Sequence, residues 1–204
     1  MEVTDWHQKN RKAWNEAAAQ YQKDYGEAVE FLRGGGQNLL AEEQKLLGDL
    51  SGCKHALHLQ CAGGTDTLSL INRGAKRVTG VDISEKMIDL ARNKSSELGM
   101  QAEWNCCDVL DTPDSLNGTC DLVYTGKGAI NWIHSLDAWA GVVFRLLKSG
   151  GRFLLFDGHS FAYFFEIKTD ELKMDPTYPG YFSSKVFSEN EGPETYIYPK
   201  VLPE

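Results

Sequence analysis

The segment from Ala56 to Asp82 constrains the fold more than any other part of the chain. A short apolar run, Ala56 to Leu59, leads into the small-residue turn Cys61-Ala62-Gly63-Gly64, and a helix pattern begins at Thr65. A second apolar run, Val78 to Val81, ends in the carboxylate of Asp82. A strand, a glycine turn, a helix and a second strand ending in an acid are the parts of a nucleotide-binding βαβ unit. The small residues let the backbone approach a ligand, and the carboxylate can accept hydrogen bonds from two ribose hydroxyls.

Beyond this segment, apolar strand patterns alternate with amphipathic helix patterns. Helices are expected at 5–24, 39–49, 65–73, 84–98 and 136–148, strands at 54–60, 76–82, 101–107, 120–125 and 152–157, and a glycine loop at 31–36. Strands that are apolar throughout are typical of a parallel sheet buried on both faces. The pattern therefore predicts the α/β class: a Rossmann-like, doubly wound and mostly parallel sheet with helices on both faces.

Composition and charge narrow the function classes. The chain has 204 residues, enough for one domain or one domain with a cap, and a net charge of −8 without a basic cluster, which disfavours nucleic acid as a partner. No apolar run approaches the roughly 20 residues needed to span a membrane, and the N-terminus lacks a signal-peptide pattern. The 5 cysteines form no C-x-x-C pair, so we expect reduced thiols, a cytoplasmic location and no metal site.

The residues at the strand ends resemble the class I S-adenosylmethionine-dependent methyltransferases. The resemblance extends from residue 10 to residue 165. It is carried, in order, by the turn and helix at 58–70, by Gly80-Val81-Asp82-Ile83-Ser84, by Asp108, by Asp121-Leu122-Val123-Tyr124 and by Leu146-Leu147-Lys148-Ser149-Gly150-Gly151. Dinucleotide dehydrogenases do not share the last of these motifs, and the order and separation of them all make the signal specific.

The resemblance implies S-adenosyl-L-methionine as the cofactor and a set of residues that bind it. Asp82 would hold the ribose diol, Ile83 would pack on adenine, and Asp108 would accept a hydrogen bond from the adenine amino group. The implied set consists of His58, Gln60, Cys61, Ala62, Gly64, Asp82, Ile83, Met87, Asp108, Val109, Tyr124 and Thr125, with Tyr21 from an N-terminal lid and Arg33 from a loop that would close over the cofactor carboxylate.

The glycine turn departs from the usual form of the family. His58 stands where an acid is usual, and Gln60 and Ala62 stand where glycines are usual. An acid there commonly helps to bind the cofactor ammonium, which a neutral imidazole would do less well. A His-Leu-Gln-Cys form occurs within the family, so we interpret these residues as a subfamily trait.

The resemblance also implies a domain organisation. An N-terminal helical lid is expected at 1–50, a cofactor-binding Rossmann-like domain at 51–159, and an aromatic-rich C-terminal cap or substrate segment at 160–204. The family completes its sheet with a helix and a β-hairpin, but the last segment does not have that pattern, and only one short strand, at 195–199, is expected. The C-terminal hairpin is therefore expected to be incomplete, and the unpaired sheet edge favours a homodimer.

Methyl transfer from a sulfonium is an in-line displacement with a neutral leaving group, so positioning is the main task of the protein. A general base is needed only when the acceptor has a proton to lose. The candidates for that base are His134, His159 and Tyr124, each of which also has a structural interpretation. His58 is expected to be a half-buried structural histidine beside the ligand, and His7 and His55 are expected at the surface.

Three hypotheses follow for the function. The first is a methyltransferase acting on a small-molecule acceptor, whose identity the family resemblance leaves open because the family methylates oxygen, nitrogen, carbon and sulfur. The second is a non-catalytic binding or interaction protein derived from a methyltransferase, which the altered turn favours. The third is an NAD(P)-dependent oxidoreductase, which would also explain Asp82 but lacks the G-x-G-x-x-G turn.

Overall fold

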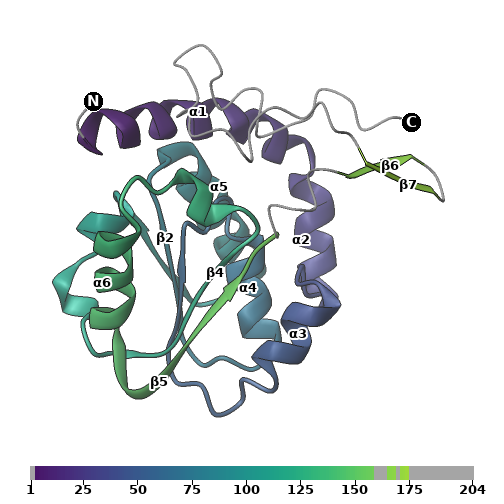
Figure 1. Cartoon of the computed structure of the whole chain (residues 1–204). Helices are drawn as coiled ribbons and strands as arrows, with labels where there is room; N and C mark the ends of the chain where they lie inside the picture. Colours follow the sequence, from purple (N-terminus) through teal and green to yellow (C-terminus); the bar gives the residue numbers. More distant parts are fainter. Residues whose placement is uncertain (1–2, 159–164, 169–170, 175–204) are drawn as a thin grey trace. The chain divides into compact units, whose positions relative to one another are not determined.

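Five parallel strands form the central sheet. The computed structural model describes residues 3–158, 165–168 and 171–174. The strands are β1 (Ala56–Leu59), β2 (Val78–Asp82), β3 (Ala102–Cys106), β4 (Cys120–Gly126) and β5 (Leu147–Phe156), in the spatial order β3-β2-β1-β4-β5 (Figure 1). The chain order reverses between β1 and β4, as in a doubly wound fold. The predicted α/β class is confirmed.

Helices cover both faces of this sheet. The connections within the sheet contain α4 (Thr65–Asn72), α5 (Glu85–Leu98) and α6 (Leu136–Leu146), while α1 (Val3–Lys23), α2 (Tyr25–Arg33) and α3 (Ala41–Leu47) precede β1. Short 3₁₀ helices are η1 (Val109–Asp111), η2 (Asp114–Leu116) and η3 (Ala129–Trp132). Figure 1 shows α6 on one side of the sheet and α2, α3 and α4 on the other. Within the described part of the chain, no helix has both the length and the apolarity that crossing a membrane requires.

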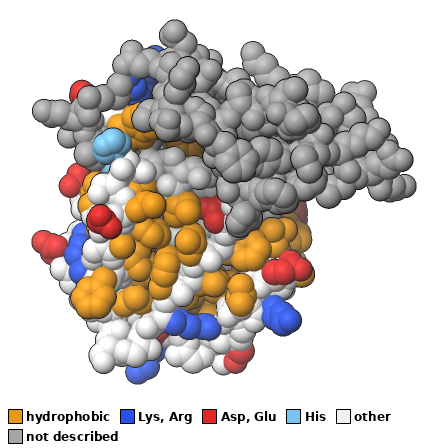
Figure 2. Space-filling model, viewed as in Figure 1, with side chains coloured by type: hydrophobic (Ala, Val, Ile, Leu, Met, Phe, Trp, Pro, Cys, Tyr) orange, Lys and Arg blue, Asp and Glu red, His pale blue; other side chains and the backbone are white. Residues whose placement is uncertain are grey.

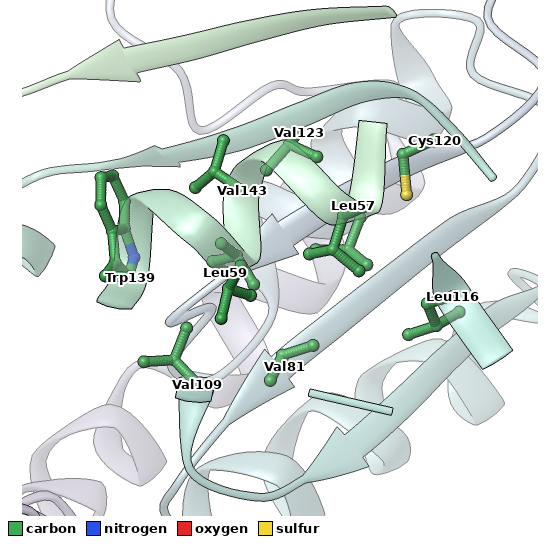
Figure 3. Packing of buried hydrophobic residues seen from close by; sticks show 11 residues of the cluster. Leu57, Leu59, Val81, Val109, Leu116, Cys120, Val123, Trp139 and Val143 are labelled. Atoms are coloured by element: carbon green, nitrogen blue, oxygen red, sulfur yellow. The ribbon is translucent and has the colours of Figure 1, made fainter. Parts of the chain in front are cut away.

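Two hydrophobic clusters hold the helices to the sheet. Leu57 and Leu59 of β1 pack in one cluster with Trp139 of α6 (Figure 3). Ala56, the neighbour of Leu57, belongs to a second cluster with Leu70 of α4. Successive side chains of a strand point to opposite faces, so a strand buried on both faces must be apolar at consecutive positions. This is the physical reason for the continuous apolar runs in the sequence.

Element boundaries differ from the sequence prediction, most clearly at α2 and at the junction of α6 with β5, which begins at Leu147 and not at 152. Helix α2 extends to Arg33 into the segment predicted as a loop, because Val29 and Leu32 are buried on one face of an additional helix. Helix α6 ends at Leu146, two residues earlier than predicted, because Leu147 already pairs with Cys120 of β4. In both cases a tertiary contact decided where the helix stops.

The chain divides into two units, Met1–Phe156 and Asp157–Glu204. In the second unit, β6 (Phe165–Lys168) and β7 (Glu171–Met174) pair as an antiparallel two-stranded sheet. The expectation that this segment lacks a hairpin pattern was therefore wrong. The strands are short and are not joined by the glycine turn that usually marks a hairpin in a sequence. The expected strand at 195–199 lies outside the described residues.

The sheet of the first unit has β5 at one edge. Phe153 and Leu155 of β5 are each 39% exposed, and Phe144 of α6 is 82% exposed. Figure 2 shows hydrophobic side chains gathered on the face of the molecule where Figure 1 places α6 and β5. An edge strand with exposed apolar side chains is a surface suited to association.

Candidate active site

A cavity lies at the carboxyl ends of β1, β2, β3 and β4. Its lining includes most of the residues that the sequence assigned to a cofactor, namely Tyr21, His58, Gln60, Cys61, Ala62, Gly64, Asp82, Ile83, Asp108 and Val109. It also includes residues outside the predicted cofactor-binding set, among them His7, Asn10, Trp14, Asn38, Asp66, Lys127 and Trp132. The parallel topology brings the strand ends together, as expected of the binding crevice of an α/β sheet.

Four other sequence-assigned residues do not line this cavity. Met87 and Thr125 are buried, and Met87 packs with Ala18 of α1. Arg33 is exposed, with Nε 3.2 Å from Glu30 Oε1. Tyr124 is buried, and its hydroxyl contacts Glu43 of α3. The cofactor roles of these residues stay predictions.

The turn after β1 keeps a glycine-like backbone without glycine at two positions. Gln60 has a φ of 55° and Ala62 a φ of 44°, both in the left-handed region. The Gln60 amide donates to the Ala129 carbonyl oxygen at 2.7 Å and accepts from Trp139 Nε1 at 3.2 Å. The side chain that replaces a glycine thus fastens the turn to η3 and α6. Strained backbone of this kind persists where surrounding contacts hold it, and it is frequent at functional sites.

Asp82 ends β2 at the centre of the cavity wall. Its Oδ2 accepts the Ala62 N–H at 2.8 Å, and its Oδ1 accepts the Ser84 N–H at 2.9 Å. Burial raises the pKa of this carboxyl to about 6, although these backbone bonds favour the ionised form. Each carboxylate oxygen has a second lone pair, so the group can still accept hydrogen bonds from a diol.

His58, Tyr124 and Glu43 form a buried stack beneath the turn. The His58 and Tyr124 rings lie 4.5 Å apart between centroids, and Tyr124 Oη donates to Glu43 Oε1 at 2.5 Å. Burial, with the charge of Lys127, lowers the pKa of His58 to about 3, so the imidazole is neutral. Burial and the nearby acids Asp66 and Glu43 raise the pKa of Tyr124. The Tyr124 hydroxyl is therefore held as a hydrogen-bond donor to an acid.

An ion pair, Lys127 with Asp66, lies at the β4 end of the cavity. Lys127 Nζ donates to Asp66 Oδ1 at 3.0 Å and to the Asn38 carbonyl oxygen at 2.6 Å. The Asn38 amide donates to the same Asp66 oxygen at 2.7 Å. Burial raises the pKa of Asp66, and the Lys127 charge opposes that shift. The sequence did not indicate this pair, because its members are 61 positions apart in the chain and no local pattern connects them.

Lys94 of α5 supports the turn and is not among the cavity-lining residues. The side chain is buried, and Nζ donates to the Gly63 carbonyl oxygen at 2.8 Å and to Thr65 Oγ1 at 3.0 Å. Burial lowers the pKa of this lysine to about 8. The contact fixes the Gly63 carbonyl of the turn and the first residue of α4.

Helix α1 closes one wall of the cavity. Asn10 Nδ2 donates to the Trp132 carbonyl oxygen at 2.9 Å, and the Trp14 and Trp132 rings lie 5.4 Å apart. His7, on the same face of α1, is 3% exposed and its Nδ1 hydrogen-bonds with Asp108 Oδ2. The expectation that His7 lies at the surface was wrong. Its spacing of three and seven residues from Asn10 and Trp14 places it on their helix face, a signal that was available in the sequence.

The other histidines are also placed by tertiary contacts. His55 is buried, with its Nε2 2.9 Å from Thr79 Oγ1, so its expected surface position was wrong as well. His134 is exposed and its ring lies 5.9 Å from Trp6, away from the cavity lining. His159 lies outside the described residues. Among those residues, no cluster of His, Cys, Asp and Glu could hold a metal ion.

Comparison with known proteins shows similarity to methyltransferases. Residues 56–151 match a family model described as a methyltransferase domain. Over these residues the chain is similar to the domains of that family. The domain is 32% identical over 112 residues to a demethylmenaquinone methyltransferase of Leptospira interrogans, which covers 53% of this chain and 45% of that protein. It is 39% identical over 56 residues to a ubiquinone biosynthesis O-methyltransferase of Coxiella burnetii, covering 28% of this chain and 24% of that protein.

A solved structure shares the fold. A putative S-adenosyl-L-methionine-dependent methyltransferase from Methanococcus maripaludis superimposes with a TM-score of 0.55 at 14% identity, covering 71% of this chain and 64% of that one. At this identity the likeness shows the fold alone. The chain spans about half the length or less of the curated relatives that it matches, 45% in the Leptospira protein.

Proposed function

We propose that this domain binds S-adenosyl-L-methionine and transfers its methyl group to a small-molecule acceptor. The observation that carries the proposal is Asp82: a buried carboxylate at the end of β2, lining a cavity beside a strained glycine turn, in a region similar to the domains of the methyltransferase family. An acid in this position can accept both hydroxyls of a ribose. The relatives named for demethylmenaquinone and ubiquinone biosynthesis support a small-molecule acceptor.

The chemistry along the strand ends fits the parts of this cofactor in order. At the β3 side the cavity has the apolar side chains of Ile83 and Val109, which suit a flat base. At the end of β2 it has Asp82, which suits a ribose diol. At the β4 side it has Asp66 and Lys127, which suit the ammonium and the carboxylate of an amino acid. Asp66 would thus supply the negative charge that His58 does not.

The protein's task in the transfer is positioning. The cofactor, when bound, supplies a methyl group on a sulfonium. The cavity walls hold donor and acceptor in line, and the aromatic side chains of Trp14 and Tyr21 keep water from that part of the cavity. Two of the three candidates for a general base do not suit that role. Tyr124 donates its hydroxyl proton to Glu43, and His134 is not among the residues that line the cavity. An acceptor without a proton to lose, or one activated by its own ionisation, fits this arrangement.

The test is calorimetric titration of the protein with S-adenosylhomocysteine and with NADH. Wild type is expected to bind the first and not the second. Asp82→Ala is expected to weaken S-adenosylhomocysteine binding by roughly 2–4 kcal/mol, because a charge-assisted pair of hydrogen bonds is lost. Asp89→Ala on the exposed face of α5 is the matched control and should bind as wild type does. Equal affinity of wild type and Asp82→Ala would refute the ribose assignment.

Binding and turnover are separate questions for this family. Binding without methyl transfer to any member of a panel of phenols, amines, thiols and activated carbons would favour the non-catalytic alternative. That alternative rests on the altered turn. Against it, Gln60 and Ala62 adopt the left-handed backbone that glycines usually provide, so the turn keeps room for a ligand.

The net charge, the free cysteines and the exposed apolar side chains support proposals about partners and location. We expect no nucleic-acid partner, since the net charge is −8. The free cysteines support a reducing, cytoplasmic compartment. The edge position of β5 and the exposed side chains of Phe144 and Phe153 support self-association as a homodimer.

A further inference from the structure

An unpartnered histidine nitrogen lies at the β3 side of the cavity. The His7 ring lines the cavity and is 3% exposed. Its Nδ1 hydrogen-bonds with Asp108 Oδ2, while its Nε2 is buried and has no partner among the described residues. Buried polar atoms of native proteins are nearly always satisfied, so an orphan atom on a residue that lines a cavity points to a missing ligand atom.

The contact with Asp108 fixes which ring nitrogen of His7 carries the proton in the neutral imidazole. A carboxylate oxygen accepts hydrogen bonds, so Nδ1 of His7 carries the proton that it shares with Asp108. In the neutral ring, Nε2 is then an acceptor that needs a donor. The other oxygen of Asp108 accepts the Leu110 N–H at 2.9 Å, so each oxygen has one protein partner and the carboxylate holds the ring in place.

The position of Asp108 in the sheet indicates which group of the ligand donates to His7 Nε2. Asp108 follows β3, the strand next to β2, and Ile83 and Val109 line the same cavity as Asp82 and His7. A nucleoside whose sugar is held at Asp82 would place its base there. We propose that His7 Nε2 accepts a hydrogen bond from the exocyclic amino group of adenine, with Asp108 as the residue that positions the imidazole. This inference rests on the proposed function. It assigns recognition of the adenine amino group to His7 of helix α1, whereas the sequence analysis assigned it to Asp108 in the loop after β3.

The test compares two ligands that differ at that group and in the proton on the adjoining ring nitrogen N1. S-adenosylhomocysteine carries an amino group on its base, and S-inosylhomocysteine carries a carbonyl oxygen, which would face the Nε2 lone pair. By calorimetry, wild type is expected to bind the adenine ligand about tenfold or more tightly than the hypoxanthine ligand. In His7→Phe the ring shape is kept and the acceptor is lost, so the two affinities should agree within about threefold.

Further variants make the experiment decisive. His7→Gln can donate to Asp108 with its amide nitrogen and present its oxygen to the cavity, so it should recover part of the preference for adenine. His134→Phe removes an exposed histidine outside the cavity lining and should keep the wild-type preference. Thermal melting checks that each variant folds, and His7→Leu replaces His7→Phe if the larger ring prevents folding.

The outcomes separate this inference from the proposed function. If wild type binds neither ligand, the proposed function fails and the inference fails with it. If wild type prefers adenine and the apolar variants of His7 keep the full preference, the proposed function stands and the role of His7 is wrong. Loss of the preference in Asp108→Ala with retention in His7→Phe would assign the amino group to Asp108 directly.

Discussion

The carboxyl group of Asp82 has an environment that makes it sensitive to pH. Burial raises its pKa to about 6, above the value of 3.8 for the free side chain. Because the folded state holds this proton more tightly than the unfolded state, the contribution of Asp82 to stability is present below pH 3.8 and is lost as the pH rises through about 6. The hydroxyls of a ribose require the opposite form, since they donate to the carboxylate.

This shift predicts the pH dependence of cofactor binding. Affinity for S-adenosylhomocysteine should be constant from pH 8 to 7 and should fall below about pH 6, by roughly tenfold at pH 5, as the carboxyl group becomes protonated. Calorimetry across this range measures the effect. Asp82→Asn should bind more weakly at neutral pH and show a flatter profile, whereas His7→Phe should keep the wild-type slope. A flat wild-type profile would mean that a bound diol does not contact this carboxylate.

At the scale of the element, the turn between β1 and α4 shows why one glycine cannot be replaced. Gly64 has a φ of 77°, and a Cβ at this position would lie 2.6 Å from Ala91 Cβ and 2.6 Å from the Trp104 ring. Gly64 is therefore needed for packing against α5 and β3 as well as for its backbone conformation. Gly99, which caps α5, has a similar φ of 64° but open space around the Cβ position.

The two glycines make a matched pair for a stability measurement. Gly99→Ala should lose about 1–2 kcal/mol of unfolding free energy, because alanine is strained at positive φ. Gly64→Ala should lose roughly 1–3 kcal/mol more, because the methyl group also overlaps rigid neighbours. Urea denaturation of the two variants gives the difference directly. Equal losses would show that α5 can shift to accommodate the methyl group.

At the scale of the whole molecule, the exposed apolar side chains of α6 and β5 bear on assembly. A chain of 22.8 kDa that forms a homodimer should scatter light with twice that mass at micromolar concentration. If the α6 and β5 surface forms the interface, Phe144→Glu should give the monomer mass, since the side chain is 82% exposed in the single chain. Leu46→Glu, at a 57% exposed residue of α3, is the control and should leave the mass unchanged. A wild-type protein that scatters light with the mass of a monomer would contradict the proposed homodimer.

The sequence alone determined the elements whose signals are local. Strands apolar at successive positions, the small-residue turn and acids directly after strands predicted the parallel sheet and the placement of Asp82 and Asp108 at its binding edge. Topology makes this possible, because all parallel strands present their carboxyl ends on one side of the sheet. The sequence did not indicate the direction of Tyr124: the alternation along β4 turns its side chain toward Glu43 of α3 and away from the cavity lining.

Only the tertiary structure decided which distant residues complete the site. His7 meets Asp108 across 101 positions, Tyr124 meets Glu43 across 81, and Lys127 meets Asp66 across 61. Periodicity reports which face of an element is buried, but it does not report which element covers that face. The α1 wall of the cavity, the contact of Tyr124 with Glu43 and the ion pair at the β4 end therefore depend on chain packing, whereas the strand-end carboxylates follow from local pattern and connectivity.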